Sequence, residues 1–232
     1  MAAQLVVGAD RGIAHAMVHH LHGRGGEVVA VCFGDGADLA AAGVTVEPHV
    51  DVTSDEAVTG LAKRLEQRGT RLERLVHVAG IMHLDTLDTV DLDDARRQFE
   101  VNTLGPLRVV RALRGLLDPG ATVGILTSRV GSLGDNTSGG DYAYRISKAG
   151  ANMVALNLHH DLASRGVMVQ ALHPGMVRTH LLDVIDPGEM ERYASAFAAP
   201  EDAAARLVAA LDALTPDTAG RFQHADGTYL PW

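Results

Sequence analysis

Six short apolar runs, separated by longer helical patterns, constrain the fold of this chain more than any other feature. The runs are rich in β-branched residues, as buried strands are, and cover Ala3–Val7, Glu27–Cys32, Val44–Pro48, Leu72–Val78, Ala121–Thr127 and Val167–Leu172. Helical patterns lie between them at Gly12–His22, Ser54–Arg68, Leu92–Leu117 and Tyr142–Arg165. Strands that alternate with helices join through right-handed crossovers. The pattern therefore predicts an α/β fold, a doubly wound parallel sheet with helices on both faces.

The length and composition of the chain are those of a protein with one hydrophobic core. A chain of 232 residues with 47% hydrophobic side chains is long enough to bury it, so we expect a single domain over 1–232. The run Gly131–Gly140, rich in Gly, Ser, Asp and Asn, predicts a loop that borders a site. A second irregular stretch, His180–Glu201, follows the sixth strand and is a candidate lid.

Charge and apolar patterning exclude several classes of partner. The chain has 20 basic and 29 acidic side chains, a formal charge of −9, which argues against nucleic acid and anionic membranes. No apolar stretch approaches the ~20 residues that cross a bilayer, and no signal segment opens the chain. Cys32 is the only cysteine, has no disulfide partner and lies in an apolar run, so we expect it in the core. These features predict a cytoplasmic protein.

Tyr144 and Lys148 form the most informative local pattern. Residues four apart lie on one face of a helix, about one turn from each other. A fixed ammonium ion beside a phenol favours the phenolate, and a phenol with a lowered pKa can act as an acid-base catalyst. The spacing alone is equally typical of an ordinary exposed helix.

The turn between the first strand and the first helix is rich in small residues. It reads Val7-Gly8-Ala9-Asp10-Arg11-Gly12-Ile13-Ala14. Small residues let a backbone approach a pyrophosphate, which then meets the free N–H groups of the following helix. A glycine-rich turn at this place favours nucleotide binding.

Five further motifs follow in order along the chain. They are Asp51-Val52 after the third strand, His77-Val78-Ala79-Gly80 after the fourth, Val101-Asn102 on a helix, Thr127-Ser128 after the fifth strand and His173-Pro174-Gly175-Met176-Val177-Arg178-Thr179 after the sixth. With the glycine turn and the Tyr/Lys pair, this order resembles the short-chain dehydrogenase/reductase family of Rossmann-type enzymes. The Tyr-Arg-x-Ser-Lys motif and the Leu-Pro-Trp ending are similar to the sniffer-like carbonyl reductases and C-factor proteins.

The chain departs from the family pattern in three places. Val7 stands where Thr is usual, Ala14 replaces the last glycine of the turn, and His77-Val78 replaces a pair of Asn residues. We expect His77 to take over a structural hydrogen-bonding role from Asn. Tyr142 also precedes the motif, but its neighbour four residues on is Ile146, which has no charge.

The resemblance implies an NAD(P)-dependent oxidoreductase that acts on a small carbonyl or alcohol. It implies that Tyr144 exchanges a proton with the substrate oxygen and that Ser128 hydrogen bonds the same oxygen. Lys148 would lower the Tyr144 pKa and hold the nicotinamide ribose, and Asn102 would anchor a water molecule linking Lys148 to solvent. Two alternatives stay open: a dehydratase or isomerase that uses Tyr144 without net redox change, and a nucleotide-binding signalling or regulatory protein.

The family also implies where the cofactor binds. The expected cofactor-binding residues are Gly8, Asp10, Arg11, Gly12, Ile13, Asp51, Val52, Ala79, Gly80, Tyr144, Lys148, Pro174, Gly175, Val177 and Thr179. Arg11 stands where many family members that use NADP carry a basic residue, so we expect NADP(H) rather than NAD(H). Asp35, near the end of the second strand, would reverse this preference if it accepted from the ribose 2′-hydroxyl.

Two further expectations concern metal ions and assembly. His15, His19 and His22 share a helix face at a spacing that metal sites use, but we interpret them as a polar face because no nearby carboxylate or cysteine completes a set. The family requires no metal. It implies a homodimer or homotetramer built through Leu92–Leu117 and Tyr142–Arg165.

Overall fold

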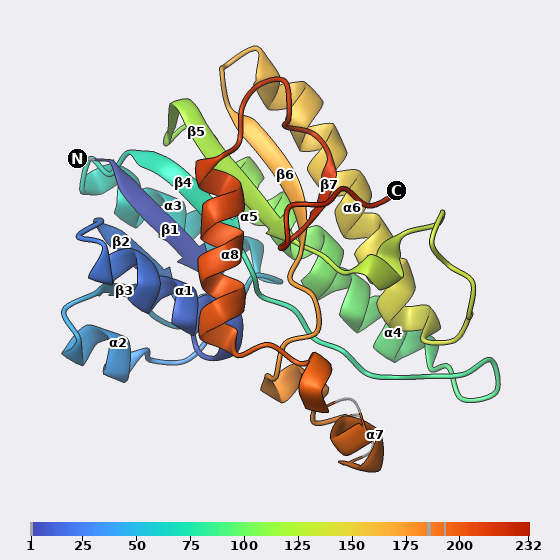
Figure 1. The fold of residues 1–232 in the computed structure, drawn as a ribbon. Helices are drawn as coiled ribbons and strands as arrows, with labels where there is room; N and C mark the ends of the chain where they lie inside the picture. Colours follow the sequence, from blue (N-terminus) through green and yellow to red (C-terminus); the bar gives the residue numbers. More distant parts are fainter. Residues whose placement is uncertain (1, 185–186, 193) are drawn as a thin grey trace.

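The computed structural model describes residues 2–184, 187–192 and 194–232, and its centre is one parallel sheet (Figure 1). Seven strands lie in the order β3-β2-β1-β4-β5-β6-β7, and every neighbouring pair runs parallel. The strands are β1 (Ala3–Val7), β2 (Val28–Val31), β3 (Thr45–Glu47), β4 (Leu72–His77), β5 (Leu117–Leu126), β6 (Met168–His173) and β7 (Phe222–His224). The order reverses beside β1, which creates the switch point where open α/β sheets bind ligands.

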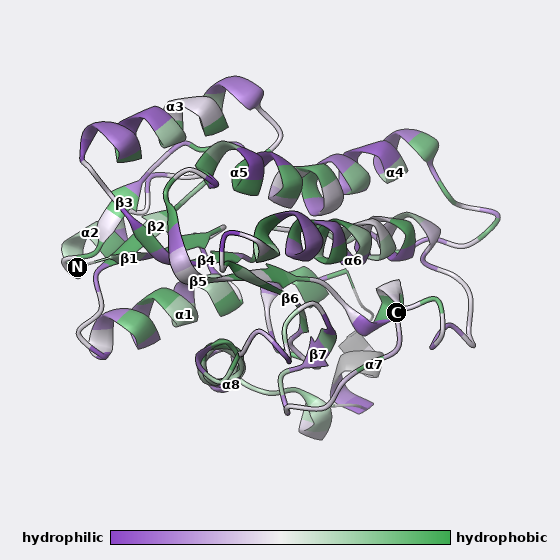
Figure 2. Ribbon diagram, turned by 90° about the horizontal axis from the view of Figure 1, so that it is seen from above, coloured by the Kyte–Doolittle hydropathy of each residue, from purple (hydrophilic) through white to green (hydrophobic). Residues whose placement is uncertain are grey.

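Helices cover both faces of the sheet (Figure 2). On one face lie α3 (Asp55–Gln67), α4 (Leu92–Phe99), α5 (Gly105–Leu113) and α6 (Tyr142–Ala163). On the other lie α1 (Gly12–Gly23) and α8 (Pro200–Asp212), which pack against each other. Two shorter helices complete the described set, α2 (Ala37–Ala41) and α7 (Pro187–Arg192).

Each face of the sheet has its own apolar core. Leu5, Leu75 and Ile125 project into the core under α3, α5 and α6, whereas Val6 and Val76 project into the core under α1 and α8. All four residues of β2 are buried, as expected for a strand covered on both faces. This double burial explains why the strands read as continuous apolar runs.

The structure confirms the doubly wound fold and the six predicted strands, with ends shifted by a few residues. Ser54 begins α3 as predicted, since its hydroxyl accepts from the Ala57 N–H at 3.1 Å. The single helix predicted over Leu92–Leu117 is wrong. A π-helical segment, Glu100–Leu104, separates α4 from α5, and the last residue of the predicted range already begins β5.

Among the described elements, the sequence did not predict the helices α2, α7 and α8 or the strand β7. The stretch His180–Glu201, expected to be irregular, contains 3-10 turns at His180–Leu182 and Ala194–Ala196, the helix α7 and the beginning of α8. A parallel bridge joins Val177, just before this stretch, to Ala198 near its end. The tail after β7 returns over the sheet, where Trp232 stacks on Phe222 with ring centroids 5.8 Å apart.

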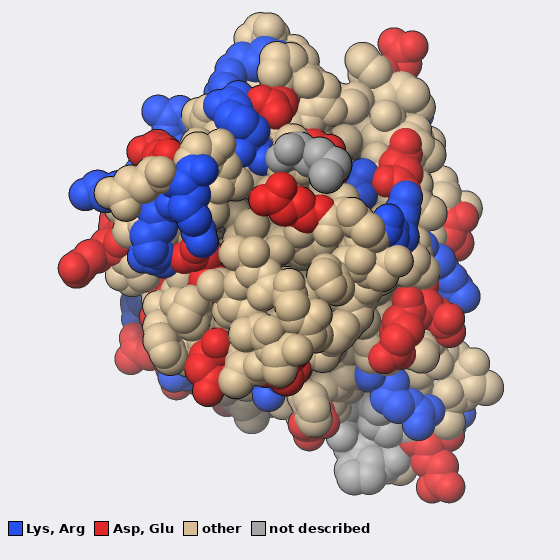
Figure 3. Space-filling view, turned by 90° about the vertical axis from the view of Figure 1, so that its left-hand side faces the viewer, with Lys and Arg blue, Asp and Glu red and all other residues tan. Residues whose placement is uncertain are grey.

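Charged side chains of both signs are interspersed on the surface. On the face drawn in Figure 3, basic and acidic groups lie close together around an area that carries neither. Paired examples include Arg24 and Arg74, which both contact Asp212. No helix in the described part of the chain is long and apolar enough to cross a membrane.

The helix α6 approaches the π-helical segment closely at Gly150. A Cβ atom at this position would lie 2.7 Å from Thr103 Cγ2 and 2.8 Å from Thr103 Oγ1. Thr103 cannot turn aside freely, because its hydroxyl donates to the Ser147 carbonyl at 2.7 Å. The contact fixes α6 against the segment that carries Asn102.

Gly150→Ala should therefore destabilise the fold by about 1–3 kcal/mol, the usual effect of overpacking. Gly23→Ala is the matched control, since Gly23 also lies in a helix and a Cβ there would meet nothing within 4 Å. It should be neutral or stabilising by about 0.5–1 kcal/mol. Urea unfolding measures both, and equal effects of the two substitutions would contradict the tight contact.

Candidate active site

The glycine turn after β1 lies against the segments that follow β4 and β6. Gly8 has φ +86°, and a Cβ built on it would lie 2.7 Å from the backbone of Ala79. Gly12 has φ +62°, and a Cβ there would lie 3.3 Å from Thr179 Cγ2. Predicted cofactor-binding residues from three strand ends are thus in contact. The two glycines let the turn pack closely against these segments and leave the backbone before α1 without side chains there, which fits the approach of a pyrophosphate.

Asp10 connects this turn to the end of β2. Its carboxylate accepts from the Phe33 N–H at 2.9 Å and from the Gly34 N–H at 2.7 Å. Cys32 is fully buried beside it, as expected, and its pKa rises to about 11 through burial and then through the charges of Asp10, Asp38 and Asp35. Several carboxylates therefore surround the place where the ribose 2′ position of the cofactor is expected.

The remaining predicted residues of the adenine side differ in exposure. Arg11 is exposed and extended before the first turn of α1, whose Ile13 is buried. Asp51 is held by Thr53, which donates to its carboxylate from both the backbone N–H and the hydroxyl. Val52 is buried in the core.

Tyr144 and Lys148 are both buried on the inner face of α6. Tyr144 is 7% exposed and Lys148 is 4% exposed, and the Lys148 Nζ lies 5.7 Å from the centre of the Tyr144 ring. The Nζ atom donates to the Leu126 carbonyl at 3.2 Å, at the end of β5. Tyr142, by contrast, is 38% exposed, which supports Tyr144 as the tyrosine of the pair.

The pKa expected for Tyr144 is corrected by the structure. Burial raises its pKa to about 12, while the hydrogen bond with Ser128 acts in the lowering direction. Lys148 lies beside the ring, as its spacing predicts, but it is not among the causes that shift the Tyr144 pKa. Removing the ring from water disfavours the phenolate. Ser128 is nevertheless close enough to the Tyr144 hydroxyl to act on its pKa, as a shared task at one substrate oxygen requires.

Burial also acts on Lys148 and on His77 beside it. The Lys148 pKa falls to about 8, because the ammonium ion is out of water. The His77 pKa falls to about 3, mainly through burial and then through the Lys148 charge. The Nε2 atom of His77 is buried and has no partner among the described residues, so this nitrogen does not supply the structural hydrogen bond expected of His77. A hydrogen bond to its own backbone acts on the His77 pKa in the raising direction. A neutral imidazole lies next to a cation.

Asn102 occupies the π-helical segment between α4 and α5. Its side-chain oxygen accepts from the Ile81 N–H and its amide donates to the Ile81 carbonyl, both at 2.8 Å. The same amide donates to Ser147 Oγ at 2.9 Å, which links Asn102 to α6. A Cβ on Gly80 would lie 3.1 Å from Asn102 Oδ1 and 3.4 Å from Lys148 Nζ. Gly80 is therefore the point where the predicted residues Asn102 and Lys148 meet.

The segment after β6 forms the opposite wall. Gly175 has φ +82°, and a Cβ there would lie 3.4 Å from His224 Nε2. His224 belongs to β7 and was not predicted from the sequence, because the three-residue strand gives no pattern of its own. Val177 is buried next to the bridge with Ala198, and Pro174 is half-buried.

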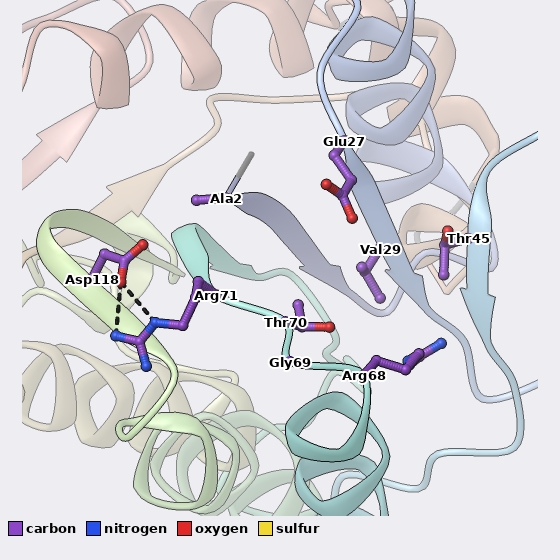
Figure 4. A pocket seen from close by; sticks show the side chains of 9 residues that line it. All are labelled: Ala2, Glu27, Val29, Thr45, Arg68, Gly69, Thr70, Arg71 and Asp118. Atoms are coloured by element: carbon purple, nitrogen blue, oxygen red, sulfur yellow. Dashed lines mark hydrogen bonds and ion pairs between the residues drawn. The ribbon is translucent and has the colours of Figure 1, made fainter.

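A cavity of about 720 Å³ lies at the opposite ends of the strands and is not the candidate site (Figure 4). It is lined at the amino ends of the strands, where Arg71 pairs with Asp118 at 2.7 Å and Arg68 pairs with Glu47. Its cations are thus already paired. Ligands of open α/β sheets bind at the carboxyl ends of strands.

The histidines predicted to form a polar face have local partners. His15 pairs with Asp38 at 2.6 Å, and its ring meets His19 edge-on. Within the described ranges no three side chains from His, Cys, Asp and Glu converge as metal ligands do.

The fold and this arrangement of residues define a nicotinamide-dependent oxidoreductase. A family model described as enoyl-(acyl carrier protein) reductase matches residues 7–213. The chain belongs to the short-chain dehydrogenase/reductase family.

Two relatives show how far the likeness extends. The chain is 60% identical over 232 residues to 1-hydroxy-2-glutathionyl-2-methyl-3-butene dehydrogenase of Rhodococcus sp. (strain AD45), covering 100% of both chains. It is 40% identical over 161 residues to the C-signal protein of Myxococcus xanthus, covering 68% of this chain and 91% of that one.

Solved structures of similar fold include carbonyl reductases and a short-chain dehydrogenase/reductase. The NADPH-bound carbonyl reductase from chicken fatty liver is 25% identical with a TM-score of 0.88 and covers 100% of this chain and 98% of its own. A Burkholderia multivorans short-chain dehydrogenase/reductase with bound NADP is 29% identical with a TM-score of 0.84, covering 100% and 99%. The carbonyl reductase Sniffer of D. melanogaster, at 24% identity and a TM-score of 0.87 over 100% of both chains, shares the fold.

Removing the buried charge should stabilise the protein. A folded-state pKa of about 8, against 10.5 in the unfolded chain, means that burial of the ammonium destabilises the fold fully below pH 8. This cost is lost as the pH rises towards 10.5. Lys148→Met should raise the free energy of unfolding at pH 7 by about 1–3 kcal/mol.

Lys63→Met is the matched control, because Lys63 is the other lysine of the chain and is exposed. Urea unfolding from pH 7 to 10.5 should show the gap between wild type and Lys148→Met narrowing, and no such trend for Lys63→Met. A destabilised Lys148→Met at pH 7 would contradict the argument.

Proposed function

We propose that this chain oxidises the alcohol group of a glutathione conjugate, transferring a hydride to a nicotinamide cofactor. The observation that carries the substrate class is the 60% identity, over the whole of both chains, to a dehydrogenase whose substrate bears a hydroxyl on one carbon and a glutathionyl group on the next. The wider reductase likeness supports the same chemistry on a carbonyl in reverse.

The catalytic roles follow from the contacts in the site. When bound, the nicotinamide ring accepts the hydride that leaves the carbinol carbon. Tyr144 takes the hydroxyl proton, Ser128 hydrogen bonds the same oxygen, and the C–O single bond becomes a carbonyl. Lys148 places a cation behind the phenol, and Asn102 fixes the loop at Ile81 beside it. In the reductive direction Tyr144 returns the proton.

Because the pKa of Tyr144 is raised, the bound cofactor and substrate must favour its phenolate before Tyr144 can take a proton. A phenol with a pKa of about 12 is a poor base at neutral pH. Lys148, with a pKa of about 8, still carries its charge at pH 7 and is the nearby cation able to favour the phenolate. The cation of an oxidised nicotinamide ring would act in the same direction.

The assembly and location of the protein belong to the same proposal. Exposed apolar side chains lie along the outer face of α6 at Tyr142, Ile146 and Met153, which supports a homodimer or homotetramer through this helix. The single sheet supports one dinucleotide-binding domain over 1–232. The buried free thiol of Cys32 supports a cytoplasmic location.

Tyr144→Phe should reduce turnover of 1-hydroxy-2-glutathionyl-2-methyl-3-butene by at least about 10³-fold, because the proton acceptor is lost. Absorbance at 340 nm follows the reaction, and cofactor affinity should change less than about 3-fold. Tyr142→Phe, on the outer side of the same helix turn, is the matched control and should stay active.

Three outcomes separate the alternatives. Full activity of Tyr144→Phe would overturn the catalytic assignment. Tight cofactor binding by the wild type without turnover of any alcohol or carbonyl would favour the regulatory alternative, which the likeness to C-signal keeps in view. Product formed with substoichiometric cofactor and no change at 340 nm would indicate a non-redox reaction.

The preference between NADP(H) and NAD(H) depends on opposing charges at the β2 end of the site. Exposed Arg11 supports the predicted preference for NADP(H), whereas Asp10 already occupies two backbone N–H groups that a 2′-phosphate would use. Asp10→Ser should raise the affinity for NADPH relative to that for NADH by about 10-fold. Arg11→Ala should lower this ratio of affinities by about 10-fold. Fluorescence titration gives both dissociation constants; shifts in the opposite directions would refute this view of the site.

A further inference from the structure

The helix that carries Tyr144 begins without a cap of its own. Asp141 precedes α6 in a left-handed conformation with φ +48°, and its side chain makes no capping bond. No acidic residue lies in the first turn of α6. The first N–H groups of a helix need partners, and this sequence supplies none locally.

A residue 57 positions earlier in the chain supplies them. The Asp85 carboxylate accepts from the Tyr142 N–H at 2.6 Å through Oδ1 and from the Ala143 N–H at 3.0 Å through Oδ2. The Asp85 backbone carbonyl also accepts from the Asp141 N–H at 2.9 Å. All three bonds end within three residues of Tyr144.

The segment that carries Asp85 passes the cofactor side of the site first. It leaves β4, contains Gly80 and is held at Ile81 by Asn102. Its middle is held by Gln98, whose amide donates to the His83 carbonyl at 3.2 Å. In Figures 1 and 2 the segment between β4 and α4 and the loop before α6 lie at the same end of the molecule. One segment is therefore bonded to Asn102 at one point and to the beginning of the Tyr144 helix at another.

We propose that Asp85 is a positioning residue that sets the place of the Tyr144 hydroxyl relative to Ser128, a role that rests on the proposed function. A bidentate carboxylate on two successive N–H groups fixes both the axial position and the rotation of the first helical turn. Without it, that turn frays, and the phenol leaves hydrogen-bonding distance of Ser128. Catalysis is sensitive to such shifts, since a misplacement of about 1 Å costs about 10²-fold in rate.

The test compares Asp85→Ala with Asp85→Asn and with Asp88→Ala. Asp88 lies in the same segment, is exposed and makes no side-chain bond among the described residues, so it is the matched control. Single-turnover hydride transfer, followed at 340 nm, should slow by about 10–100-fold in Asp85→Ala. Asp85→Asn should recover part of the rate, because an amide oxygen still accepts one bond. Asp88→Ala should stay within about 2-fold of wild type.

A second readout separates positioning from stability. The Ser128 hydrogen bond lowers the Tyr144 pKa, so its loss should move the limb of the kcat/KM profile that requires the phenolate to higher pH. Dissociation constants for the cofactor should change less than about 3-fold, since the glycine turn is untouched. Thermal unfolding should show a decrease of a few degrees in Asp85→Ala.

The outcomes distinguish this proposal from the function on which it rests. If Asp85→Ala only lowers the melting temperature and keeps the wild-type hydride-transfer rate and pH limb, Asp85 has a merely structural role. If Asp85→Ala and Asp88→Ala behave alike, the proposal is also overturned. If Tyr144→Phe stays active, the proposed function itself fails.

Discussion

The site depends on an ammonium ion held out of water. Lys148 lies at the carboxyl end of β5, where it donates to the Leu126 carbonyl and its ammonium group is near the ring of Tyr144. Among the described residues no carboxylate compensates the charge, since burial is the only cause that shifts its pKa and a nearby carboxylate would raise it. A buried charge of this kind destabilises the fold unless a bound group offsets the cost of removing the ammonium ion from water. In the proposed function, this cation is available to the hydroxyl groups of the cofactor ribose and to the developing phenolate of Tyr144.

The surrounding structure keeps this cation in place without neutralising it. Neighbouring polar groups are amides, hydroxyls and carbonyls: Asn102 bonds to Ile81 and Ser147, and Thr127 donates to the Lys148 carbonyl. Even the nearby imidazole of His77 is held neutral by burial and by the cation itself. An Asn-to-His replacement at this position leaves the charge balance of the site unchanged, although it leaves one nitrogen without a partner.

The sequence predicts the sheet well because burial on both faces of a parallel strand leaves a continuous apolar run. It predicts β7 and α2 poorly, because three- and five-residue elements are fixed by tertiary pairing rather than by pattern. The α8 helix had a usable signal, with Pro200 at its first position and acidic Glu201 and Asp202 after it. The interruption at Glu100–Leu104 also had a signal, because Gly105 and Pro106 follow it and the proline cannot donate to the preceding turn.

Spacing and environment explain why the site was only partly predictable. The spacing of four residues from Tyr144 to Lys148 fixes their proximity on any helix, and that geometry is found. Their pKa values depend on burial, which follows from the loops and helices packed around them. Burial raises the pKa of Tyr144, whereas the spacing predicted a lowered pKa. Asp85 shows the same limit, since nothing near it in sequence indicates a helix 57 residues later. Motifs predict which residues meet, whereas long-range contacts decide how their protons behave.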